Sequence, residues 1–172
     1  PYIGENIDCP YCGAKGSMVT SNITKGLSEE QLNLVYNLFS TYLHSMSSGG
    51  QEIPCQEAKL CELITAVTNY SCGTEYCTPE SGGLPLDWSE YREPGTQFIK
   101  ASTYSSSIAK QIKKVYQMSE AKRREMGKRA RQFVLDGFSI EVIGKKIEAI
   151  IDSMPAVDWD YEFEEPMNDA TF

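Results

Sequence analysis

The spacing of apolar residues predicts alternating helices and strands. Ser28 and Gln31 form a capping box, and apolar residues at helical spacing follow as far as Leu38, so a helix is expected there. The segment STYLHS, residues 40–45, predicts a strand. The β-branched run at residues 64–68 predicts a second strand, buried on both faces.

The same reasoning places the other elements. We expect strands at residues 17–22 and 97–101, helices at 54–63, 105–118, 119–135 and 139–154, and a long loop at 70–95. This alternation predicts an α/β fold, a Rossmann-like parallel sheet with flanking helices that is incomplete at its N-terminus. Ligands of such sheets bind beyond the carboxyl ends of the strands.

Composition narrows the class of protein. The chain has 172 residues, of which 41% are hydrophobic, which is enough for one domain with a core. No apolar run approaches the roughly 18 residues that span a bilayer, and we expect a cytoplasmic protein without a membrane span. A net charge of -8 argues against a nucleic-acid partner. Because the sequence begins with Pro1, we expect a partial chain.

The segment SSGGQEIPCQE, residues 47–57, carries the most informative chemistry. Gly49 and Gly50 precede a helix that starts near Pro54, and such a start leaves backbone N–H groups free for an anion such as a diphosphate. Glu57, about one turn into the helix, can accept hydrogen bonds from sugar hydroxyls. The competing interpretation of Glu57 is a solvated first-turn glutamate favoured by the helix dipole.

Several segments together resemble the C-terminal half of GT-B glycosyltransferases, in particular the large retaining family that uses nucleotide-sugar donors. The similarity covers roughly residues 20–154. It is carried by LSEEQLNLVYNLFSTYLHS, GGQEIPCQEAKL, LITAVTNYSCG, and the closing QFIKA strand with its helices, including the stretch from Arg123 to Ser139.

The resemblance implies roles for individual residues. Glu57 matches the second of the family's paired glutamates, which holds the donor ribose. The first would fall at Gly49, which has no carboxylate, and Glu52 either takes over contact with the sugar or points into solvent. The turn whose amides contact donor sugar and phosphate matches Gly50, Gln51, Glu52 and Ile53. His44, the single histidine, is expected to be structural.

The resemblance also implies an activity and an organisation. Such enzymes transfer a sugar from a nucleotide-diphosphate donor, here to an unknown glycan, lipid or protein acceptor, and they need no cofactor or metal for catalysis. Residues 21–154 would form the donor-binding domain, and residues 155–172 an acidic aromatic tail. The N-terminal acceptor domain and the basic residues that clamp the phosphates are missing from this chain, so we expect it to be inactive alone.

The cysteines suggest a structural metal. Cys9 and Cys12 in CPYCG are spaced like half of a zinc ribbon, and residues 1–20 are interpreted as a partial segment of that kind. Either a second pair upstream or Cys72 and Cys77 would complete a structural Zn²⁺ site, and free cysteines are a further alternative. The remaining two, Cys55 and Cys61, are expected to pack as small apolar residues.

A different class of function is also open. Twelve of the 16 lysines and arginines lie between Lys100 and Lys146. A non-catalytic Rossmann-like module could dock a partner through basic helices, with Lys122, Arg123, Arg124, Lys128, Arg129 and Arg131 as the contact residues. A solvated helix pair is the simpler interpretation of the same charges. Loss of Glu57 discriminates, because only the glycosyltransferase would lose donor affinity.

Overall fold

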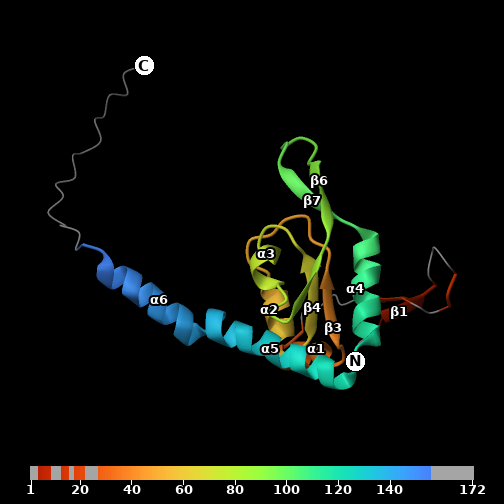
Figure 1. Ribbon diagram of the computed structural model, residues 1–172, viewed down its shortest axis with the longest axis horizontal. Helices are drawn as coiled ribbons and strands as arrows, with labels where there is room; N and C mark the ends of the chain where they lie inside the picture. The colour runs from red at the N-terminus through yellow and green to blue at the C-terminus, as the bar shows by residue number, and fades with distance from the viewer. Residues whose placement is uncertain (1–3, 9–12, 16–17, 22–26, 156–172) are drawn as a thin grey trace, which may run out of the picture.

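The computed structural model describes residues 4–8, 13–15, 18–21 and 27–155 (Figure 1). The strands are β1 (Gly4–Ile7), β2 (Met18–Ser21), β3 (Thr41–His44), β4 (Ile64–Thr68), β5 (Gly83–Leu86), β6 (Trp88–Arg92) and β7 (Ile99–Thr103). The helices are α1 (Glu29–Asn37), α2 (Ile53–Leu60), α3 (Gly73–Tyr76), α4 (Ser105–Gln117), α5 (Glu120–Phe138) and α6 (Ile140–Ser153). Among these helices, none combines the length and the apolar character needed to cross a bilayer.

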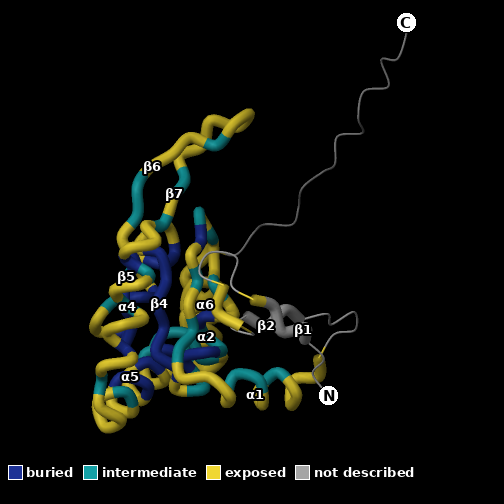
Figure 2. Tube along the Cα trace, turned by 90° about the vertical axis from the view of Figure 1, so that its right-hand side faces the viewer, coloured by how far each residue is buried: buried dark blue, intermediate teal, exposed yellow. Residues whose placement is uncertain are grey.

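A small parallel sheet organises the fold. Its three strands are ordered β3-β4-β5, with Thr41 opposite Ile64 and Thr65 opposite Gly83. All five residues of β4 are buried, as predicted for the central strand (Figure 2). The chain is therefore mixed α/β, with helices flanking a parallel sheet, which confirms the coarse fold class expected from the sequence.

The sheet is covered on both faces. Val67 of β4 belongs to a cluster with Met46, Cys55 and Tyr76, which come from the β3–α2 connection, α2 and α3. On the other face, Ile64 and Ala66 pack with Leu84 of β5 and with residues of α4 and α5. Figure 1 shows α2 and α3 on one side of the strands and α4 on the other. Alternate residues of β4 thus belong to two separate hydrophobic clusters.

Local sequence accounts for the helix boundaries. The capping box is confirmed: Ser28 Oγ accepts from the Gln31 amide at 3.3 Å, and Gln31 Oε1 accepts from the Ser28 amide at 3.0 Å. Pro54 lies in the first turn of α2, where a missing N–H costs least. The prediction that α2 continues to residue 63 is wrong, because Glu62 has a φ of 61° and turns the chain into β4.

The predicted loop at residues 70–95 is also wrong, since it contains α3, β5 and β6. Pro85 lies within β5, an edge strand of the parallel sheet, where a strand can lack one N–H. β6 forms an antiparallel hairpin with β7, which begins at Ile99, two residues later than expected. The strand at residues 17–22 is confirmed as β2, and it pairs with an antiparallel partner, β1, that the apolar pattern did not indicate.

Candidate functional site

The glycine-rich connection lies between the carboxyl end of β3 and the start of α2, where the sequence placed the site. The Ser71 hydroxyl donates to the Gly49 carbonyl oxygen at 2.5 Å and fixes the connection against the end of β4. A Cβ on Gly49 would lie 2.8 Å from Glu52 Oε1, whereas one on Gly50 would meet nothing within 4 Å. Gly49 is therefore closely packed, and the space beside Gly50 is open.

Two successive amides just before α2 lack a partner. Within the described part of the chain, the backbone N–H groups of Gly50 and Gln51 donate to no other group, whereas the Glu52 amide hydrogen-bonds to the Cys72 thiol. The next amide, of Ile53, donates to the Gln51 carbonyl at 3.2 Å. A row of unsatisfied N–H groups at a helix start carries partial positive charge and can accept an anion.

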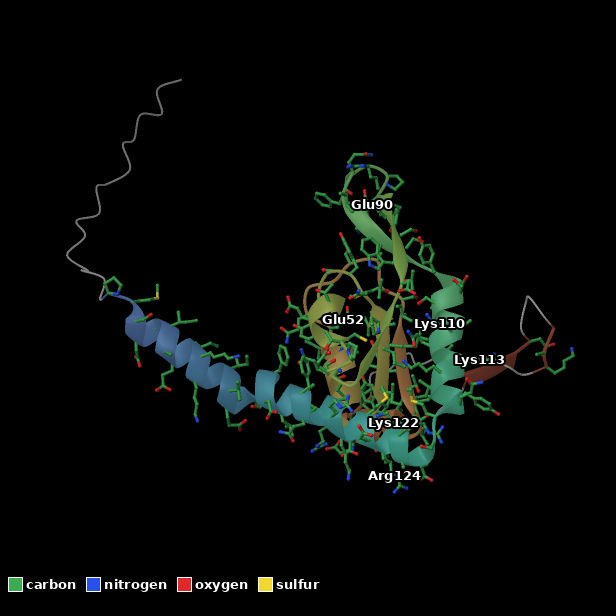
Figure 3. All side chains as sticks on the ribbon, in the orientation of Figure 1. Glu52, Glu90, Lys110, Lys113, Lys122 and Arg124 are labelled. Carbon is green, nitrogen blue, oxygen red and sulfur yellow. The ribbon has the colours of Figure 1, made fainter. Side chains whose placement is uncertain are left out.

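Glu52 does not point into solvent, which was one of the two interpretations open from the sequence. Its carboxylate lies 2.9 Å from His44 Nδ1, and the side chain is only 14% exposed. The Tyr42 hydroxyl lies 3.4 Å from the same His44 nitrogen. Burial raises the pKa of Tyr42 to about 12, and Glu52 contributes to that shift. His44, which the sequence suggested to be structural, thus joins the site through Glu52, the residue labelled in Figure 3.

Glu57 lies one turn further into α2 and faces α1. The Tyr36 hydroxyl donates to Glu57 Oε2 at 2.8 Å. Desolvation and this hydrogen bond raise the pKa of Tyr36 well above its usual range, so Tyr36 stays a donor. The other oxygen of Glu57 has no partner among the described residues. Glu57 is therefore held by one oxygen and can accept from a ligand with the other.

A groove of about 300 Å³ opens at Glu57 between α1 and α2. Its walls combine apolar and polar side chains. Besides Glu57, the lining residues are Glu29, Leu32, Asn33, Tyr36, Leu60 and Cys61. Residues 49–53 do not line this groove. Ile53 and Glu57 are four residues apart, which corresponds to about 6 Å along the helix. The site thus consists of an amide row at the helix start and a carboxylate in an adjoining groove.

A buried lysine fixes α2 in this position. Lys59 is fully buried, and its Nζ donates to the Ser81 carbonyl at 2.5 Å and contacts Ser81 Oγ at 3.1 Å. Its ammonium lies 5.3 Å from the centroid of the Phe133 ring. Desolvation lowers the pKa of Lys59. Because Lys59 follows Glu57 by two residues, these contacts connect the site to the α3–β5 connection and to α5.

The cysteines outside the N-terminal segment are buried or half-buried thiols. Cys72 and Cys77 flank α3 within the core, and burial raises the pKa of both thiols. Cys55 packs in the core as expected, whereas Cys61 is only half-buried beside Asn33. In the described segments, no three His, Cys, Asp or Glu side chains gather as metal ligands. Cys9 and Cys12 lie outside those segments, so the zinc site remains a prediction.

Sequence reasoning named the glycines and both glutamates but missed the groups that hold them. Tyr36 and Ser71 are single polar residues whose role depends on the packing of distant elements, and no local pattern marks them. His44 precedes Glu52 by eight residues, a separation that the turn after β3 closes.

No protein-family model, curated protein or solved structure matches this chain.

Proposed function

We propose that this chain forms most of the donor-binding half of a glycosyltransferase that uses a nucleotide-diphosphate sugar. The observation that carries the proposal is the placement of the open amides of Gly50 and Gln51 just before α2, the helix that carries Glu57, in the connection that follows a parallel strand. A Rossmann-like parent sheet of the GT-B type would place its ligand at this edge.

The chemistry assigned to each group follows from its charge and position. The diphosphate would accept hydrogen bonds from the amide row, and the dipole of α2 would stabilise the negative charge that develops as the diphosphate departs. The free oxygen of Glu57 would accept from ribose hydroxyls. Glu52, held by His44, would accept from a hydroxyl of the sugar. These roles require no metal.

Two open surfaces support the idea that a further domain completes the enzyme. Strand β3 pairs with β4 on one side only, so its other edge is free within the described residues. Helix α6 has no buried residue, and Met154 directly after it is exposed, as are its isoleucines, namely Ile140, Ile143, Ile147, Ile150 and Ile151. An acceptor-binding domain would cover such surfaces, and it would supply cationic side chains for the diphosphate.

Calorimetric titration with UDP, GDP and their common sugar conjugates tests the proposal. We expect one nucleotide to bind, and Glu57→Ala to weaken that binding at least tenfold, because a charged hydrogen bond to a ligand contributes about 1.5–3 kcal/mol. Glu75→Ala is the control, since Glu75 is exposed on α3. Equal binding by the wild type and Glu57→Ala would contradict the proposed site. A non-catalytic docking module would give that result.

A further inference from the structure

Helix α4 carries a cationic groove that the proposed donor site does not use. The groove has a volume of about 420 Å³ and is lined by Lys110, Lys113, Lys114, Gln117 and Met118, which define the α4 groove. Figure 3 labels Lys110 and Lys113 along α4, across the sheet from Glu52. The donor site and the α4 groove are thus separate surfaces.

The lysines of the α4 groove differ from Lys122 and Arg129 of the neighbouring helix α5, which are paired with a carboxylate. In α5, Lys122 pairs with Glu125 at 3.1 Å, and Arg129 pairs with the same carboxylate at 2.6 Å. The three groove lysines are exposed and form no ion pair with any described residue. Residues 105–131 contain nine Lys or Arg and two Glu, so the surrounding surface is strongly positive. Nothing in the described part of the chain neutralises the α4 groove.

The C-terminal segment has the complementary chemistry. Residues 156–172 contain six Asp or Glu and no Lys or Arg. Within residues 158–164, acidic and aromatic residues alternate as DWDYEFE, and Glu165 follows. In an extended backbone, this alternation would place Trp159, Tyr161 and Phe163 on one side and the carboxylates of residues 158–164 on the other. The α4 groove offers ammonium groups beside the Met118 thioether, which makes favourable contacts with aromatic rings.

Distance excludes pairing of the segment with its own groove. Helices α5 and α6 have 19 and 14 residues, which correspond to about 28 and 21 Å. Figure 1 shows them running in one line away from the end of α4. The stretch from Pro155 to Glu165 spans at most about 37 Å when fully extended. It therefore falls short of the α4 groove, about 50 Å away by helix length.

We propose that residues 158–165 of one copy of this chain bind the α4 groove of a second copy. The carboxylates pair with Lys110, Lys113 and Lys114, and an aromatic side chain packs on Met118. Because exposed ion pairs are screened by salt, the association is strongest at low ionic strength.

Sedimentation velocity of the full chain provides the test. We expect concentration-dependent association at low salt, and a dissociation constant at least about tenfold weaker in K110E/K113E/K114E, the effect of losing three exposed ion pairs. Neutralising the tail (D158N, D160N, E162Q, E164Q and E165Q) should have the same effect. The matched control R92E/K145E/K146E carries the same charge change on exposed basic residues outside the groove. This control should associate like the wild type.

A mixture of the groove variant and the variant with the neutralised tail gives the most specific test. The groove variant retains its tail and the neutralised chain retains its groove, so the mixture should associate although neither chain does alone. A wild type that stays monomeric at low salt would overturn the proposal, as would equal loss of association in the control. A monomeric chain that instead cosediments with phosphatidylserine vesicles through the groove lysines would identify a membrane as the occupant and would also overturn it.

Discussion

Alanine substitutions at two glycines of α5 should change the free energy of unfolding in opposite directions, because α5 closely approaches the end of α2 at only one of them. At Gly127, an added Cβ would lie 2.2 Å from the Glu62 carbonyl oxygen, whereas at Gly137 it would meet nothing within 4 Å. Alanine in place of glycine stabilises a helix by about 1 kcal/mol when nothing opposes it. Gly137→Ala should therefore raise the free energy of unfolding by up to about 1 kcal/mol.

At Gly127 the steric term exceeds the gain in helix propensity. The obstructing atom belongs to the backbone of Glu62, whose φ of 61° already places it in the left-handed region. Overpacking of this kind costs about 1–3 kcal/mol, and a rigid backbone obstacle places the cost at the upper end. Gly127→Ala should thus lower the free energy of unfolding by about 2 kcal/mol net.

Urea unfolding followed by circular dichroism measures both changes, with unfolding midpoints compared at a common slope. Stabilisation of Gly127→Ala equal to that of Gly137→Ala would refute the reasoning, because α5 would then not touch the turn after α2. That result would also mean that α5 does not hold the end of α2, the helix that carries Glu57.

Two further predictions concern the support of the site. Because burial lowers the pKa of Lys59 from its ordinary 10.5, the unfolded chain binds this proton more tightly, and Lys59 destabilises the fold less as pH rises toward 10.5. The wild type should therefore gain stability relative to Lys59→Met with rising pH, by at most about 1.4 kcal/mol per pH unit in urea unfolding. If the free energy of unfolding of the wild type does not rise relative to that of Lys59→Met up to pH 10.5, the charge is not buried. Tyr36→Phe removes the hydrogen bond to Glu57, and calorimetry should show donor affinity about three- to tenfold weaker. Unchanged affinity would mean that Tyr36 does not position Glu57.

The parts of the fold that the sequence predicts are those specified by local pattern. The capping box at Ser28 and the buried run of β4 each depend on residues close together in the chain. The errors fall where tertiary context decides. Strand β5 reads GLPL, which lacks β-branched residues, and it forms a strand because β4 pairs with it and α4 covers it.

The candidate site also combines a feature that local sequence predicts with contacts that depend on tertiary packing. A glycine pair before a helix-starting proline is a local signal, and the structure places it at a strand end. Glu52 pairs with His44, eight residues before it, and Glu57 pairs with Tyr36, 21 residues before it. Such contacts depend on how α1, β3 and α2 pack, which periodicity alone does not specify.

The most direct test of the donor site is a nitrogen–proton correlation spectrum of the labelled chain during titration with the nucleotide diphosphates. Binding at the proposed site should shift the amide signals of Gly50 and Gln51 first, together with residues of α1 and α2 around Tyr36 and Glu57. Shifts confined to the α4 groove, or no shift with any nucleotide, would contradict the assignment of residues 49–57 as a donor site.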